Sequence, residues 1–163
     1  RLLGCNQSYR RMIFKIQRFD ENLKRLSSGE DIDFSYRIFK KYPDSLYLTP
    51  HARLTHDYSL PSTLPSDLLI YSRTIGGFYF FHKNIEQTFL NKLIFIWHLM
   101  GSLALEVGLR IHTILRRKKP RWFKIKYLHE IKHLIKANIY AIKHIKEIKM
   151  GNLDFFQDML YSK

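Results

Sequence analysis

A run of mainly apolar residues from Leu93 to Leu109 is the feature that most restricts how this chain folds. A helix needs about 20 apolar residues to cross a bilayer, and this seventeen-residue run is interrupted by His98 and Glu106. A charged side chain at the bilayer centre costs roughly 2.5 to 3.5 kcal/mol on insertion scales. The run therefore predicts one of three structures: an interfacial or re-entrant helix, a membrane span, or a helix buried in protein.

Most of the positive charge follows this run. The chain carries 28 Lys and Arg against 14 Asp and Glu, and the stretch from Arg116 to Lys149 holds most of the excess. Such a balance predicts an anionic partner. Trp122 and Phe123, set among cations, are typical of a membrane interface, so we expect an anionic membrane surface as partner. No zinc-finger, helix-turn-helix or RNA-recognition pattern is evident in the sequence, which argues against nucleic acid.

The same stretch predicts a long amphipathic helix from Tyr127, with apolar residues at helical spacing flanked by lysines. Gly151 is the expected end of this helix. An ordinary solvated helix packed on its own domain is the alternative to a membrane-binding tail. The single Cys5 excludes an internal disulfide, so a disulfide-stapled secreted domain is excluded as well.

Three carboxylates, Glu30, Asp31 and Asp33, follow Gly29 within one turn of a predicted helix. Glu30, Asp33 and Arg37 share one helix face by their spacing, whereas Asp31 points elsewhere and is free to face a cleft. A carboxylate in that position can accept a proton from a substrate hydroxyl or hold a cation. The alternative is that the acids complement the helix N-terminus and that Asp33 pairs with Arg37.

The rest of the first sixty residues predicts short helices and strands. A short helix is expected over Tyr9–Gln17, the end of a strand at Leu2-Leu3-Gly4, and strands at Ser45–Thr49 and Ala52–His56. His56 is either a structural histidine or a metal ligand, depending on whether other ligands lie nearby. Mixed elements of this kind predict an α/β fold.

Four elements of the sequence, in order, strongly resemble family 2 glycosyltransferases. They are Gly4-x-Asn6-x-x-x-Arg10, Phe19-Asp20-Glu21, Gly29-Glu30-Asp31-x-Asp33-x-x-x-Arg37, and the segment Leu48 to His56. The resemblance covers Arg1 to about His56 and implies the C-terminal part of a Rossmann-like GT-A glycosyltransferase domain, followed by a helical membrane-associating tail. Arg18 stands where the family usually has glycine. No Asp-x-Asp precedes the glycine loop, so the nucleotide-binding half is expected to lie outside this fragment.

The resemblance also implies roles for individual residues. Asp31 matches the catalytic base that takes the proton from the acceptor hydroxyl in an inverting transfer. Glu30 matches its partner, which orients the helix or contacts the acceptor. Gly4, Asn6 and Arg37 are expected to bind substrate. His56 is expected to complete the coordination of a divalent metal, Mg²⁺ or Mn²⁺, held mostly by the missing half.

Together these features predict an enzyme that transfers a sugar from a nucleotide-diphosphate sugar to a glycan or lipid-linked acceptor. We expect residues 1–60 to form the acceptor-side catalytic part, 61–115 a loop and an apolar membrane-associating helix, and 116–163 a basic amphipathic tail. Basic residues beside the apolar run predict the cytoplasmic face of the membrane, with peripheral or single-helix attachment. The alternatives are a non-enzymatic basic helical module that binds membrane or RNA, and an inactive glycosyltransferase remnant.

Overall fold

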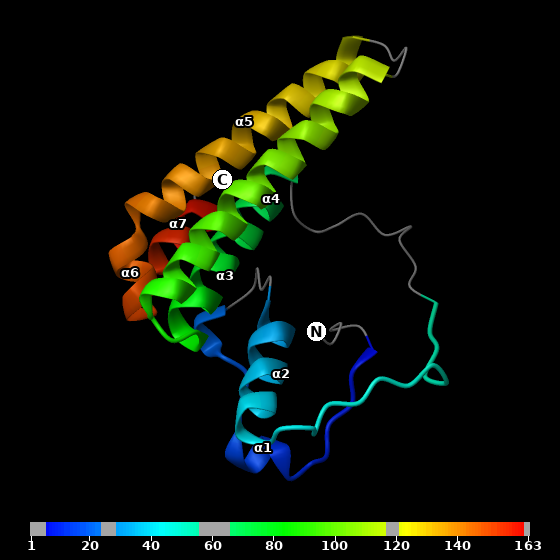
Figure 1. The fold of residues 1–163 in the computed structure, drawn as a ribbon, viewed down its shortest axis with the longest axis vertical. Helices are drawn as coiled ribbons and strands as arrows, with labels where there is room; N and C mark the ends of the chain where they lie inside the picture. Colours follow the sequence, from blue (N-terminus) through cyan, green and yellow to red (C-terminus); the bar gives the residue numbers. More distant parts are fainter. Residues whose placement is uncertain (1–5, 24–28, 56–65, 117–120, 162–163) are drawn as a thin grey trace. The chain divides into compact units, whose positions relative to one another are not determined.

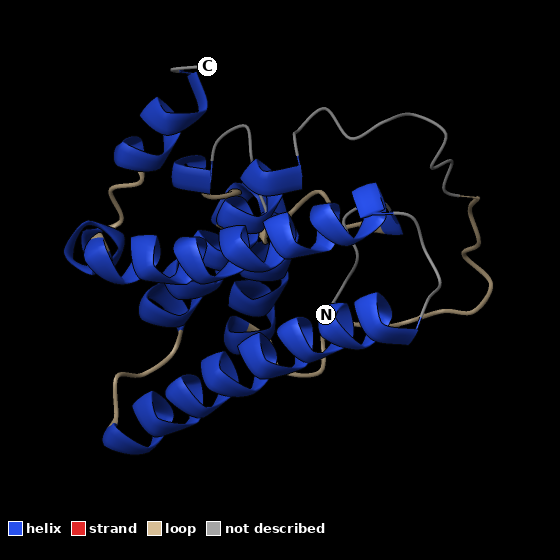
Figure 2. Ribbon diagram, turned by 90° about the horizontal axis from the view of Figure 1, so that it is seen from above, coloured by secondary structure: helices blue, strands red, loops and turns tan. Residues whose placement is uncertain are grey.

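The computed structural model describes residues 6–23, 29–55, 66–116 and 121–161. The chain divides into two compact units, 1–63 and 64–163, and each is described by itself. Every regular element in the described ranges is a helix (Figures 1 and 2). The predicted α/β, Rossmann-like fold is therefore wrong for the described part of the chain, which is all-α.

The strands predicted at Ser45–Thr49 and Ala52–His56 are wrong as far as the structure describes them. Residues 45–55 form turns and extended backbone that joins no sheet. A strand needs a second strand to satisfy its backbone N–H and C=O groups, and the described ranges contain none. Tyr47 and Leu48 are more than four-fifths exposed, so alternation here covers no apolar surface.

Helix α2 (Glu30–Lys41) begins directly after Gly29, as the sequence predicts. Gly29 precedes it with a φ of 113°, a left-handed conformation that glycine adopts without a steric penalty. The acids of its first turn complement the positive end of the helix dipole. The helix stops at Tyr42 because the following Pro43 disfavours a helical conformation in the residue before it.

A small aromatic core, centred on Phe34 of α2, holds unit 1 together. Phe34 is fully buried. Its ring contacts Phe19 at 4.2 Å, Tyr9 at 4.9 Å and Phe14 at 5.7 Å between centroids. The contacting rings come from the segment around α1 (Ile13–Ile16), a shorter helix than predicted, which is followed by the 3₁₀ helix η2 (Glu21–Leu23). Each such aromatic pair adds about 0.5 to 1.5 kcal/mol beyond burial.

Unit 2 is a helical bundle (Figure 1). It consists of α3 (Ser66–Asn84), α4 (Phe89–Arg116), α5 (Arg121–Lys143), α6 (Ile145–Met150) and α7 (Asp154–Tyr161). Helices α4 and α5 run antiparallel, and both extend past the end of α3. Helix α5 packs closely on α3 because Ala137 and Ala141, both fully buried, leave room for the facing helix.

The predicted apolar run lies inside α4, which extends it in both directions. By length and composition, Phe89–Leu115 is the one helix of the described ranges that could cross a membrane. None of its most apolar stretch is buried within the protein. Of the three structures that the sequence left open, the described residues therefore do not adopt the third, a helix buried in protein. The apolar side chains of α4 are available for membrane association.

The basic tail forms a helix that begins earlier than expected, at Arg121 rather than Tyr127, and is interrupted at His144. Its continuation, α6, ends at Gly151 as predicted. Gly151 has a φ of 77°, and the N–H of Asn152 donates to the carbonyl of Glu147 at 3.0 Å. This closing pattern satisfies carbonyls that the end of a helix leaves without partners.

Candidate functional site

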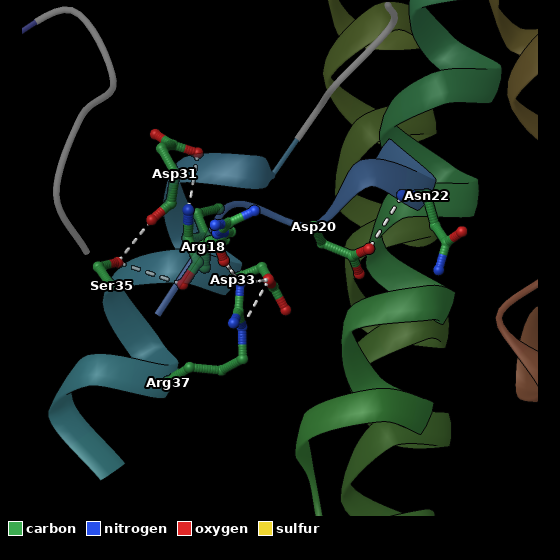
Figure 3. A network of polar contacts seen from close by, with 8 residues as sticks. Arg18, Asp20, Asn22, Asp31, Asp33, Ser35 and Arg37 are labelled. Atoms are coloured by element: carbon green, nitrogen blue, oxygen red, sulfur yellow. Dashed lines mark hydrogen bonds and ion pairs between the residues drawn. The ribbon is translucent and has the colours of Figure 1, made fainter. Parts of the chain in front are cut away.

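The acid motif of α2 is built around a buried ion pair (Figure 3). Asp33 is 1% exposed, and its Oδ2 accepts hydrogen bonds from Arg37 at 2.9 Å from Nε and 2.8 Å from a terminal nitrogen. That terminal nitrogen also donates to the backbone carbonyl of Arg18 at 2.8 Å. Arg37, which the sequence predicts to bind substrate, therefore fastens the start of α2 to the segment before η2.

Asp31 lies on a different side of the helix from Asp33, as the helical spacing predicts (Figure 3). Its side chain is partly exposed, and its Oδ1 accepts the backbone N–H of Ile32 at 2.8 Å. Burial raises the pKa of the Tyr9 phenol, and the negative charge of Asp31 raises it further. The carboxylate of Asp31 thus lies within electrostatic reach of a second group that can carry a proton.

Two polar contacts stabilise the turns around these acids. The hydroxyl of Ser35 donates to the Asp31 carbonyl at 2.7 Å, one helical turn back. The Oδ1 of Asp20 accepts the N–H of Asn22 at 2.9 Å and opens η2 (Figure 3). The bond of Ser35 is one that the sequence could have indicated, because short polar side chains favour local bonds of this kind.

The other predicted site residues are distributed as follows. Glu30 lies in the same first turn as Asp31 and is partly exposed. The side-chain amide of Asn6 donates to the carbonyl of Ala52 at 2.8 Å, so it connects the segment of the predicted glycine loop to the extended segment. Gly4 and the predicted metal ligand His56 lie outside the described residues. Among the described residues, no three His, Cys, Asp or Glu side chains cluster closely enough to hold a metal.

Unit 2 contains a second feature that the sequence did not predict, a groove of about 550 Å³ between α3 and α4. Near one end, Arg110 of α4 forms ion pairs with Glu106 one turn earlier and with Glu130 of α5, the latter at 3.2 Å. Glu106, the charge that interrupts the apolar run, is therefore paired rather than isolated. The i, i+4 spacing of Glu106 and Arg110 is typical of such a pair, whereas the contact between Arg110 and Glu130 depends on how α4 and α5 pack.

Comparison with protein-family models yields no match for this chain, and neither the curated proteins nor the solved structures include one that matches it.

Proposed function

We propose that this chain forms the acceptor side of a sugar-transferring site, with Asp31 as the general base. The donor is a nucleotide-diphosphate sugar. A divalent metal, held outside the described residues, would offset the charge of the leaving diphosphate. Asp31 takes the proton from an acceptor hydroxyl, whose oxygen attacks the anomeric carbon as the bond to the diphosphate breaks. The configuration at that carbon is inverted. The donor site and most metal ligands would lie outside this acceptor side.

The observation that supports this proposal most is the difference in burial between two neighbouring carboxylates, Asp31 and Asp33. Asp33 is buried and paired with Arg37, and it therefore serves to position the helix. Asp31, two residues earlier, is partly exposed on another side of the same turn. A general base needs access to its substrate and a fixed position. The contacts of Asp33 supply the fixed position, and the exposure of Asp31 supplies the access.

We further propose that unit 2 attaches this site to the cytoplasmic face of the membrane. Helix α4 offers large exposed apolar side chains, among them Phe89, Trp97 and Leu105. Cations that follow α4 favour an anionic leaflet by about 1 kcal/mol each near its surface. A peripheral protein of this kind meets a lipid-linked acceptor where that acceptor resides, and a glycan acceptor remains compatible with the same base.

The test uses the complete protein and an Asp31→Asn variant. Transfer is assayed with a panel of nucleotide-sugars radiolabelled in the sugar and membranes of the producing cell, with incorporation of label into the membrane fraction as the readout. Loss of a general base is expected to lower turnover by about 10²- to 10⁴-fold while donor binding stays nearly unchanged. Asp44→Asn is the matched control, because Asp44 has a φ of 61° and asparagine adopts this conformation readily.

Full activity of Asp31→Asn would refute the assignment of the base. A wild-type protein that sediments with anionic vesicles but transfers no sugar from any donor would favour the second candidate, a non-enzymatic membrane-binding module. The exposed apolar face of α4 is the observation that keeps this second candidate in view.

A further inference from the structure

The groove between α3 and α4 has the dimensions of a ligand site. Its volume is about 550 Å³, within the range of roughly 300 to 1,000 Å³ that small-molecule pockets occupy. Leu134 and Asn138 of α5 also line it. All three helices belong to unit 2, so the groove is formed within a single compact body.

Glycine and aromatic residues explain why the groove is open. Near the loop that joins α3 to α4, the rings of Phe81 and Phe95 stack at 3.9 Å, and Phe78 meets Phe95 edge-on at 5.3 Å. One turn before Phe81, Gly77 has no side chain to fill the space between the helices. A Cβ built at Gly77 meets no other atom within 4 Å, so the open space begins at the backbone of α3.

The chemistry of the lining changes along the groove. Aromatic and aliphatic side chains line the part near the α3–α4 loop, including Phe78, Phe95 and Leu99. Because α3 and α4 run antiparallel, Arg73 of α3 lies toward the part of α4 that carries Glu106 and Arg110. The groove is therefore mainly apolar, with its charged side chains toward one end, which suits a ligand with a hydrocarbon chain and a polar head.

One cation toward this end of the groove, Arg73, is available to an anionic head. Arg110 is already paired with Glu106 and Glu130. Arg73 is exposed and forms no ion pair among the residues that the structure describes. A guanidinium with open hydrogen-bond donors binds phosphate oxygens well, often through two parallel bonds.

We propose that this groove takes up one acyl chain of an anionic phospholipid from the membrane, with its phosphate at Arg73. The inference rests on the membrane attachment proposed above, and it adds a specific lipid site to it. Trp97 and Met100, on the outer side of α4, are largely exposed and do not line the groove. One side of α4 therefore offers exposed apolar side chains to a bilayer, while the other side lines the groove.

The experiment compares two glycine variants of the complete protein. Gly77→Leu places a side chain in the groove, and Gly101→Leu places the same side chain on α4 outside it, where a Cβ also meets nothing within 4 Å. Both changes replace a glycine inside a helix and so raise helix propensity. The probe is a phosphatidylglycerol with a photoreactive acyl chain, carried in phosphatidylcholine vesicles, and cross-linked peptides are mapped by mass spectrometry.

Cross-links of the wild-type protein are expected on α3 and α4 groove residues. Gly77→Leu should reduce their yield at least tenfold, while Gly101→Leu leaves it unchanged and both variants sediment with vesicles like the wild type. Arg73→Gln should abolish the preference for phosphatidylglycerol over an equivalent photoreactive phosphatidylcholine. Equal cross-linking in Gly77→Leu, or cross-links spread over the outer side of α4 alone, would overturn the lipid site but leave membrane attachment intact. Failure of the wild type to sediment would instead remove the membrane attachment on which the proposal rests.

Discussion

The ion pair between Asp33 and Arg37 allows a quantitative test of why the acid motif has its spacing. Asp33 is almost completely buried, so an Arg37→Met variant leaves a carboxylate inside the protein without its cation. Breaking a buried pair in this way typically costs about 3 to 5 kcal/mol. The Arg37 side chain is 21% exposed and water partly screens the pair, so we expect the lower end, about 3 kcal/mol.

Substitution of Asp33, alone and together with Arg37, separates the effect of losing the ion pair on stability from the effect of changing side-chain size. Asp33→Asn keeps the shape of the side chain and removes its charge, and it should cost about 1 to 3 kcal/mol. If the two residues act as a pair, the double variant is less destabilised than the sum of the two single variants by at least about 1 kcal/mol. Arg11→Met, at an exposed arginine of the same unit, should stay within about 0.5 kcal/mol of the wild type.

Urea denaturation followed by far-ultraviolet circular dichroism measures these free energies, and hydrogen exchange of the α2 amides localises them. An Arg37→Met protein as stable as the wild type, with unchanged α2 exchange, would refute the reasoning. Arg37 would then have no positioning role, and an accompanying loss of sugar transfer would return it to the substrate-binding role that the sequence implies.

Three further predictions concern the stability of the two units. Phe34→Ala removes the centre of the aromatic core and should destabilise unit 1 by about 3 to 5 kcal/mol, measured by the same denaturation. Gly151→Ala forces a residue with a Cβ into a φ of 77° and should cost about 1 to 2 kcal/mol, which Gly151→Asn should partly avoid; thermal unfolding checks both. Burial, and after it the charge of neighbouring His129, lowers the pKa of His133 below its ordinary value of 6.5. Because the unfolded chain then binds more protons, stability falls as the pH drops below about 6.5, and His133→Gln should flatten that decline in unfolding free energy measured between about pH 7.5 and pH 5.

Helix ends were predictable because their signals are local. Gly29 and Gly151 each adopt a positive φ next to a helix, and a few neighbouring residues decide whether a helix begins or stops there. The strands failed for the opposite reason. Alternating residues such as Leu46 and Leu48 make a strand only when a partner strand and a core face are present, and neither is a property of the segment itself.

In the candidate site, too, the features set by local sequence were predictable and those set by tertiary contacts were not. The pairing of Asp33 with Arg37 follows from their i, i+4 spacing, and so does the separate direction of Asp31. The hydrogen bond from Arg37 to the Arg18 carbonyl does not follow, because it depends on how the segment before α2 folds back onto the helix. The groove of unit 2 could not be predicted from the sequence for a similar reason, because Gly77 leaves a space only where α3 and α4 lie alongside one another.

The ion pairs around Glu106 affect whether α4 can cross a membrane. As an isolated charge in an apolar run, it opposes a span by roughly 2.5 to 3.5 kcal/mol. The structure pairs it with Arg110, which lowers that penalty, but Arg110 also binds Glu130 and so ties α4 to α5. Helix α5 carries exposed lysines such as Lys132 and Lys136, which a bilayer core disfavours. If α4 crossed the membrane, it would have to break these contacts or draw α5 in with it. A position in the interface, with one side of α4 in lipid and the other against protein, satisfies both helices.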